Sequence, residues 1–424
     1  MSGRADGAEP APTAGSIDPS FLRGLTQRRF DRRELFRYAG LGVGAVVLSG
    51  LADACSIPGI GVVSQPVKTS DVAKIFSGKP AGTLNFANWP YYIDFDTKTH
   101  TRPSIEKFEQ VTGIHVSYYP VINGNDTFFA KIQPALQAGQ PPEYDLMVIT
   151  NGTILDKLVK FGYLTPLDHS KMTNFAKYAS SSVKNPSYDP GNKYTMAWQS
   201  GYTGIAYDPT KTKRTISSME DLRDPAFKGK IGMFADTADM PSLALLAIGV
   251  KPETSKPDDW RRAGQWLLEQ RPLVRAYYDQ GYITALENGD IWVTMAWSGD
   301  IFIANNSDGY PNLKFVVPDE GGALWTDNMC IPVRAEHPVD AITYMDYVYQ
   351  PAVAGTIADW VSYITPVQVS RDYVLNVLKD PVVGNSPLVY PAPSDLAKAH
   401  RYYVFKNDQE EELWNSIFQP IYQA

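Results

Sequence analysis

Strand-like and helix-like segments alternate along most of this 424-residue chain, and this alternation limits the folds it can adopt. Short apolar runs predict strands, and longer amphipathic runs bounded by Pro or Gly predict helices. The expected strands cover residues 83–89, 114–119, 144–149, 202–207, 229–234, 291–297, 313–317 and 328–333. The expected helices cover residues 103–112, 127–138, 240–249, 258–270, 282–289, 338–349 and 351–360. The pattern predicts an α/β fold whose parallel sheet carries helices on both faces.

Residues 1–54 are typical of an export signal rather than of a folded domain. Asp31-Arg32-Arg33-Glu34-Leu35-Phe36-Arg37 resembles a twin-arginine signal, and an apolar run over residues 39–51 follows it. That run is shorter than the roughly 20 apolar residues of a membrane-spanning helix. Cys55 stands where cleavage is expected and predicts a lipidated N-terminus, with an ordinary signal peptide as the alternative. Residues 55–80 then form a tether.

Cysteine usage and charge narrow the class of protein further. The only cysteines are Cys55 and Cys330, so we expect no disulfide, and Cys330 is interpreted as a core residue of a strand. The net charge of -7 argues against nucleic-acid binding, because nucleic-acid-binding domains present a basic face. We also expect a monomer that holds no cofactor and no metal.

The sequence contains no recognisable catalytic motif. It lacks G-x-S-x-G, a Walker loop, H-E-x-x-H and any Cys/His cluster, and its five histidines are scattered. We therefore predict that the chain is not an enzyme. A secreted carbohydrate hydrolase remains the alternative, because Asp236 or Asp300 could act as its acid/base.

Aromatic and acidic residues stand together near the ends of several expected strands. The groups are Trp89 with Tyr92, Asp236 with Asp239, Trp297 with Asp300, and Trp325 with Asp327. Trp325 and Asp327 are two residues apart at the entry to a strand, so their side chains should face the same way. Ligands of open α/β sheets bind beyond the carboxyl ends of the strands. These groups are therefore candidates for one shared cleft.

Each group also has an ordinary structural explanation. Asp236 and Asp239 have the spacing of a helix capping box, and each tryptophan could be a core residue. Capping explains only one group, however, and it does not account for the repeated occurrence of aromatic and acidic residues near strand ends. Burying several acids would be costly for a protein with an uncharged ligand.

An aliphatic cation would use both kinds of side chain. Flat aromatic walls would hold its methylene groups, and carboxylates would hold its ammonium groups. Several acids along an apolar slot suit a ligand with more than one positive end, so the sequence predicts a polyamine. A ferric-iron site built from Tyr91-Tyr92 or Tyr402-Tyr403 is the rival, but it would leave three tryptophans without a role.

The chain resembles the spermidine- and putrescine-binding proteins of bacterial ABC importers from Leu84 to about Tyr390. The motifs that carry this resemblance are Asn88-Trp89-x-x-Tyr92, Phe108-Glu109-x-x-Thr112-Gly113-Ile114-x-Val116, Tyr144-Asp145-Leu146-x-Val148, Phe227-Lys228-Gly229-Lys230-Ile231, Met295-Ala296-Trp297-Ser298-Gly299-Asp300, Val317-Pro318-x-Glu320-Gly321-Gly322-x-x-Trp325-x-Asp327 and Tyr363-x-Thr365-Pro366. The motif that contains Glu320 is the most specific of them. The Phe-Glu-x-x-Thr-Gly block is shared by many solute-binding proteins and indicates only the fold.

The resemblance implies a two-lobed type II periplasmic-binding-protein fold with two crossovers and a ligand cleft between the lobes. Lobe 1 would comprise residues 81–203 plus 328–368, and lobe 2 residues 204–327 plus 369–424. It also implies a protein anchored by lipid at the extracytoplasmic face of the cell membrane. Its partners would be a polyamine and the permease and ATPase subunits of an ABC importer.

The resemblance further assigns roles to individual residues. An aromatic box would consist of Trp89, Tyr92, Trp297, Trp325 and Tyr363. Ammonium groups would be received by Asp236, Asp239 and Asp327, while Asp300 matches an acid of the putrescine-binding branch and Thr150 matches a Ser or Thr position. One wall departs from the family pattern at Pro90-Tyr91, at Asn151-Gly152, and at Arg401-Tyr402-Tyr403, where a glutamine is expected nearby.

Overall fold

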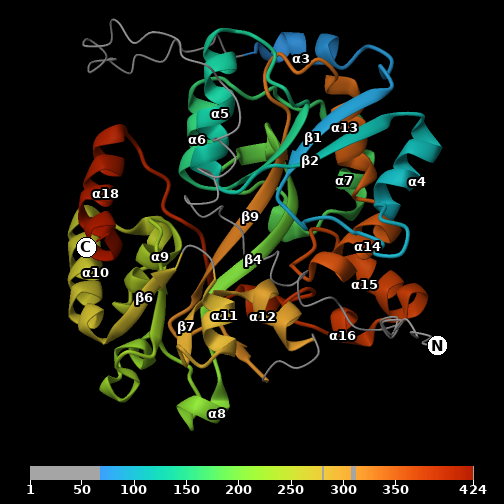
Figure 1. Cartoon of the computed structure of the whole chain (residues 1–424). Helices are drawn as coiled ribbons and strands as arrows, with labels where there is room; N and C mark the ends of the chain where they lie inside the picture. The colour runs from blue at the N-terminus through green and yellow to red at the C-terminus, as the bar shows by residue number, and fades with distance from the viewer. Residues whose placement is uncertain (1–66, 279–280, 307–311, 424) are drawn as a thin grey trace, which may run out of the picture.

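The computed structural model describes residues 67–278, 281–306 and 312–423, which form two lobes joined by two long strands (Figure 1). The expected export signal over residues 1–54, Cys55 and the first part of the tether lie outside the described residues. Within the described ranges, no helix has the length and apolar character needed to cross a membrane.

One mixed sheet of ten strands runs through both lobes in the order β2-β1-β3-β9-β4-β7-β5-β6, with β10 paired to β9 and β8 to β4. The strands are β1 (Thr83–Asn88), β2 (His115–Pro120), β3 (Leu146–Thr150), β4 (Thr195–Tyr207), β5 (Ile231–Phe234), β6 (Val274–Tyr278), β7 (Val293–Trp297), β8 (Lys314–Val316), β9 (Gly322–Cys330) and β10 (Ala399–His400). The triplets β2-β1-β3 and β7-β5-β6 are parallel, as the alternation of elements predicts. The expectation of a parallel sheet is wrong at the centre, because β4 and β9 cross between the lobes in opposite directions.

Helices cover the sheet in both lobes. They are α3 (Thr69–Ile75), α4 (Pro103–Thr112), α5 (Asn125–Gln137), α6 (Thr153–Lys160), α7 (Thr173–Tyr178), α8 (Pro209–Thr212), α9 (Asp239–Ala247), α10 (Pro257–Gln270), α11 (Tyr282–Glu287), α12 (Ser298–Asn305), α13 (Pro338–Tyr347), α14 (Pro351–Val361), α15 (Arg371–Tyr373), α16 (Pro381–Gly384), α17 (Pro393–Leu396) and α18 (Asp408–Gln423). Figure 1 shows α5 and α6 on one side of β1 and β2, with α4 and α13 on the other.

Alternating side chains build the two core layers of the first lobe. Leu84 and Phe86 of β1 pack with residues of α4 and α13, whereas Ala87 packs with residues of α5 and α6. Successive residues of a strand point to opposite faces, so one apolar strand supplies both layers. Cys330 is fully buried at the end of β9, which confirms its prediction as a core residue.

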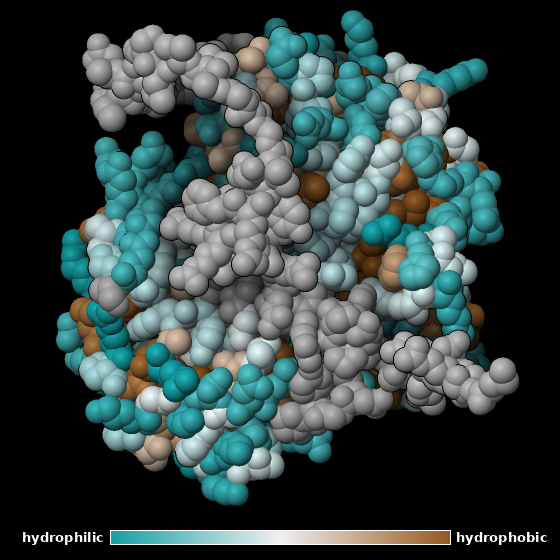
Figure 2. Space-filling view, in the orientation of Figure 1, coloured by the Kyte–Doolittle hydropathy of each residue, from teal (hydrophilic) through white to brown (hydrophobic). Residues whose placement is uncertain are grey.

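The second lobe has a separate core around β5 and β7, which α9, α10 and α18 cover. Trp260 of α10 and Trp414 of α18 meet edge to face, with ring centroids 5.3 Å apart. Figure 2 shows that the described surface on the viewed face is largely hydrophilic, with hydrophobic residues scattered between. The lobe boundaries at residues 203/204, 327/328 and 368/369 stay a prediction.

Several strands differ from the sequence expectation, including the short β10, which was not expected. β4 spans Thr195–Tyr207 instead of residues 202–207 alone, and β9 begins at Gly322 rather than at residue 328. Both strands are buried throughout, but each contains polar residues that interrupt the apolar pattern of the sequence. Ser200 of β4 and Thr326 of β9, for example, form a hydrogen bond with each other inside the sheet. β6 was not expected. The pairing of β4 with β9 also has a register shift, a β-bulge or irregularity, between Ala197 and Gln199.

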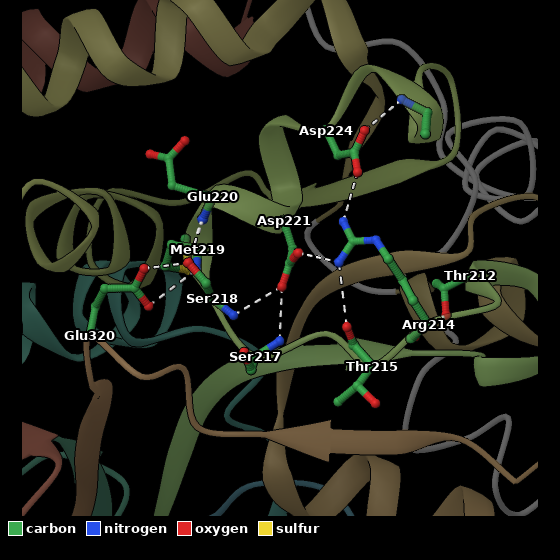
Figure 3. Close-up of polar contacts among 11 residues, drawn as sticks. Thr212, Arg214, Thr215, Ser217, Ser218, Met219, Glu220, Asp221, Asp224 and Glu320 are labelled. Atoms are coloured by element: carbon green, nitrogen blue, oxygen red, sulfur yellow. Dashed lines mark hydrogen bonds and ion pairs between the residues drawn. The ribbon is translucent and has the colours of Figure 1, made fainter.

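The start of β9 is held by Glu320, which precedes it in the turn (Figure 3). Its carboxylate accepts hydrogen bonds from the Ser218 hydroxyl at 2.5 Å and from the Met219 N–H at 3.2 Å. Asp221 accepts bonds from the N–H groups of Ser217 and Ser218 and pairs with Arg214. This network lies outside the pocket described below, so Glu320 fixes the entry to β9 and makes no direct contribution to the pocket lining.

Candidate ligand-binding site

A pocket of about 630 Å³ lies between the two lobes. Its lining includes every residue that the sequence analysis placed at the site: Trp89, Tyr92, Thr150, Asp236, Asp239, Trp297, Asp300, Trp325, Asp327 and Tyr363. These residues come from β3, β7 and β9, from the first turns of α9 and α12, and from the segments that follow β1, β5 and α14. The fold thus brings all ten together, while their roles in binding stay a prediction.

Strand register places the first carboxylate. Asp327 of β9 lies directly opposite Thr150 of β3, and the Thr150 hydroxyl donates to Asp327 Oδ1 at 2.6 Å. The Tyr92 hydroxyl donates to the other oxygen, Oδ2, at 2.8 Å. Asp327 is only 5% exposed, and burial raises its pKa to about 6 despite these two donors. Its carboxylate is therefore preorganised but poorly solvated.

Register also explains how Trp325 fits beside Asp327. Trp325 lies opposite Gly201 of β4, and a Cβ at Gly201 would fall inside contact distance of the indole ring. The ring therefore lies directly on the backbone of the neighbouring strand, which only glycine allows. The Tyr363 ring meets it at a centroid distance of 5.2 Å, and Tyr92 meets Tyr363 at 5.8 Å.

Three donors converge on Asp239 at the start of α9. Thr203 of β4 and Trp297 of β7 face each other across the strands, and both bind this carboxylate. The Thr203 hydroxyl donates to Oδ1 at 2.6 Å, and the Trp297 indole N–H donates to Oδ2 at 3.0 Å. The Tyr402 hydroxyl donates to Oδ1 at 2.6 Å. Trp297 therefore does more than provide an aromatic wall.

Asp236 divides its two oxygens between different tasks. Oδ1 accepts bonds from the N–H groups of Ala238 at 2.7 Å and Asp239 at 2.6 Å, and so caps the start of α9. Oδ2 is buried and accepts no hydrogen bond from the described residues. The expected capping box is therefore wrong, because Ala238 is the N-cap and Asp239 is the first residue of α9, although Asp236 Oδ1 still binds N–H groups at the helix start. Burial and the neighbouring Asp239 raise the pKa of Asp236 to about 7.

Asp300 is held by two phenols. The Tyr282 hydroxyl donates to Oδ2 at 2.6 Å and the Tyr363 hydroxyl to Oδ1 at 2.9 Å. Burial raises the pKa of Asp300, and it likewise raises that of Asp239. Trp89 closes the lobe 1 side of the pocket, where its indole N–H donates to the Val148 carbonyl oxygen at 3.1 Å.

The pocket is strongly acidic. Its described lining contains six carboxylates and no lysine, arginine or histidine: Asp126, Asp236, Asp239, Asp300, Asp327 and Glu411. Only Glu411 forms an ion pair among the described residues, with Lys157 at 2.8 Å. Concentrated negative charge in a partly dry cleft raises the free energy of the empty pocket, and a bound cation would relieve it.

The tyrosine pairs proposed for iron do not converge. Tyr402 donates to Asp239, whereas Tyr403 donates to Glu410 at 2.8 Å, so their phenols point to different carboxylates. Tyr92 binds Asp327, and Tyr91 is 40% exposed. In the part of the chain that the structure describes, no group of three His, Cys, Asp or Glu residues is arranged to hold a metal.

Sequence reasoning missed several residues that shape the pocket. Gly201, Thr203 and Tyr282 position the expected residues, and Tyr402 enters the lining from the C-terminal segment. A glycine inside an apolar strand signals a close approach, so Gly201 could have been noticed. Tyr402 was named only for the rival iron site and for the altered wall, because its carboxylate partner lies 163 residues away and is visible only in the fold.

The sequence was also compared with known protein families and structures. A family model described as bacterial extracellular solute-binding protein matches residues 104–383. The spermidine/putrescine-binding periplasmic protein of Salmonella typhimurium is 29% identical over 347 residues, which cover 80% of this chain and 90% of that protein. The putrescine/agmatine-binding protein of Pseudomonas aeruginosa is 28% identical over 334 residues, covering 74% and 85%.

A solved structure confirms the fold. The spermidine/putrescine ABC transporter substrate-binding protein PotD of Streptococcus pneumoniae superposes with a TM-score of 0.69 at 23% identity. The match covers 80% of this chain and 98% of that one. The expected two-lobed periplasmic-binding-protein architecture is therefore correct.

The contact between Trp325 and Gly201 can be tested by Gly201→Ala. The added methyl group must displace the indole, so we expect a loss of about 1–3 kcal/mol in the free energy of unfolding. Urea titration measures it. Gly78→Ala is the control, because a Cβ there would lie 3.9 Å from Val339, an ordinary contact. Equal unfolding midpoints for the two variants would contradict the close packing of the ring.

The cost of ionising Asp327 can be tested through pH. The folded pKa of about 6 lies above the unfolded value near 3.8, so the folded state binds the proton more tightly, and this contribution to stability disappears as pH rises from about 4 to 6. Asp327→Asn should therefore be about 1–3 kcal/mol more stable than the wild type at pH 8 and no more stable at pH 4. Urea titrations at both pH values measure the difference. A variant less stable at pH 8 would refute the argument.

Proposed function

This chain belongs to the family of bacterial extracellular solute-binding proteins, and we propose that it captures a polyamine and delivers it to an ABC permease. The family consists of transport proteins rather than enzymes, which removes the carbohydrate hydrolase as an alternative. Relatives named for spermidine, putrescine and agmatine support an amine as the ligand.

The observation that carries the proposal is the charge of the pocket. Its described lining has six carboxylates and no basic residue, and Trp325, Tyr363 and Tyr92 form an aromatic wall beside them. Cations gain roughly 2 kcal/mol over a desolvated aromatic face and about 1.5–3 kcal/mol from each charged hydrogen bond. A neutral or anionic solute would leave the buried acids uncompensated.

The positions of the acids suit a ligand with separated positive ends. Asp239 and Asp236 lie at the start of α9, on the side of the second lobe, whereas Asp327 is held by Thr150 and Tyr92 of the first lobe. A single diamine or triamine that contacts both groups would draw the lobes together. Closure would then exclude water and strengthen these contacts.

Calorimetric titration with putrescine and spermidine tests the proposal. We expect 1:1 binding that Asp327→Asn weakens by about 2–5 kcal/mol, the range for breaking a buried charge pair. Affinity should fall from pH 8 to pH 5, because the carboxylates with pKa values of about 6 and 7 must be charged to receive an ammonium group.

Two controls accompany this titration. Asp372→Asn changes an exposed acid outside the pocket and should leave the affinity unchanged. Ferric salt should give no visible charge-transfer band, as expected for a pocket whose tyrosine pairs diverge. Unchanged polyamine affinity in Asp327→Asn would disprove the assignment of this pocket.

We further propose that the protein is exported by the twin-arginine route and anchored by a lipid on Cys55, as residues 28–55 suggest. Expressed in a bacterium, the wild type should sediment with membranes, and Cys55→Ser should appear in the soluble extracytoplasmic fraction. Replacing both Arg32 and Arg33 by lysine should block export. A Cys55→Ser protein that stays in the membrane fraction would rule out this anchor.

A further inference from the structure

Tyr402 lines the pocket and forms a hydrogen bond with one of the pocket carboxylates. It follows β10, is 8% exposed, and its hydroxyl donates to Asp239 Oδ1 at 2.6 Å. The Thr203 hydroxyl donates to the same oxygen at 2.6 Å. A carboxylate oxygen has two favourable acceptor positions, so these two donors fill Oδ1.

The other carboxylate oxygens of the pocket are less occupied. Each oxygen of Asp327 and Asp300 receives one side-chain hydroxyl, which leaves a position for a ligand. At the Asp239 end the situation differs, because Asp236 Oδ1 is used by backbone N–H groups. Asp236 Oδ2 accepts no bond from the described residues, and Asp239 Oδ2 accepts only the Trp297 indole N–H, so each carboxylate at this end has one occupied oxygen and one that can still accept.

The segment around Tyr402 is anchored to the central strand β9 and to two segments of the first lobe. The Arg401 guanidinium donates to the Thr326 hydroxyl at 3.0 Å and to the Ser182 carbonyl oxygen at 3.3 Å. The Lys160 ammonium donates to the Phe405 carbonyl oxygen at 3.1 Å. These bonds hold the backbone on both sides of Tyr402, so its hydroxyl is a fixed part of the pocket.

An ammonium and a guanidinium need different arrangements of hydrogen-bond acceptors at the end of the pocket that Asp236 and Asp239 form. An ammonium is a compact charge that a single exposed oxygen can receive, whereas a guanidinium is a planar fork that prefers two adjacent acceptors. Asp236 and Asp239 are close enough for the charge of one to raise the pKa of the other. A guanidinium binds a carboxylate most strongly through two parallel bonds to its two oxygens. Asp239 could receive such a fork if Oδ1 were available, because Oδ2 accepts only the Trp297 N–H.

We propose that Tyr402 is a specificity-determining residue, whose hydroxyl takes the Asp239 oxygen that a guanidinium would need and so selects a terminal ammonium at this end. The inference rests on the proposed function. It gives Asp239 a positioning role, with Asp236 as the group that receives the ligand. It also explains why an acid that lines the pocket is already surrounded by three protein donors.

Tyr402→Phe tests the proposal, because it removes one oxygen atom and keeps the ring. The probes are putrescine and agmatine, which differ by one ammonium replaced by guanidinium. We expect the ratio of agmatine to putrescine affinity to rise at least about ten-fold, the effect of one additional charged hydrogen bond, while putrescine affinity changes less than about three-fold. When the pH is lowered, the loss of affinity should begin at a higher pH in the variant than in the wild type, because the Tyr402 bond lowers the pKa of Asp239 and the variant lacks it.

The matched control is Tyr349→Phe, which removes a buried phenol bonded to the Ala197 carbonyl oxygen at 2.5 Å, outside the pocket lining. It should leave the affinity ratio unchanged. If wild type binds putrescine but Tyr402→Phe leaves the ratio unchanged, or weakens both ligands equally, only the specificity inference fails. If wild type binds no polyamine at all, the proposed function fails first.

Discussion

The antiparallel pairing of β4 with β9 is the contact on which the pocket depends. These strands cross between the lobes side by side, and their register sets Trp325 against Gly201. The same arrangement puts Asp327 opposite Thr150 on β3 and Thr203 opposite Trp297 on β7. A shift of one residue would turn every one of these side chains to the other face of the sheet. The fixed turn around Glu320 protects the register at the point where β9 begins.

Electrostatic strain is the second organising feature of the pocket. Asp236, Asp300 and Asp327 are withdrawn from water, and burial raises the pKa of each. Hydroxyl and backbone donors offset part of this cost but supply no positive charge. The lobes can therefore hold the acids in place without neutralising them. In such a site the affinity for a cation comes from carboxylates that no basic side chain neutralises. The same uncompensated charge lowers the stability of the empty protein.

Most of the pocket was accessible to sequence reasoning because its residues follow strands or lie in them. Trp89, Asp236 and Trp297 stand where strands end, and ligands of α/β sheets gather there. Gly201 was not identified, and the bond of Tyr402 to Asp239 was not foreseen, since both depend on partners distant in the chain. The central strands were shortened in the prediction because Ser200 of β4 and Thr326 of β9 are polar, although their hydroxyls are hydrogen-bonded to each other inside the sheet. Periodicity alone cannot distinguish such residues from the end of a strand.

The irregularity between Ala197 and Gln199 in β4 has a mechanical consequence. Local disruption of a ladder lets a strand bend and twist more at that point than elsewhere. It lies at the edge of the first lobe's core, which contains Ala197, and directly beside Gln199, which pairs with Asp327. Because β4 and β9 remain paired on both sides of this irregularity, we expect a change in the angle between the lobes to be concentrated there and to follow few directions. Any partner protein would then meet a small set of angles between the two lobes.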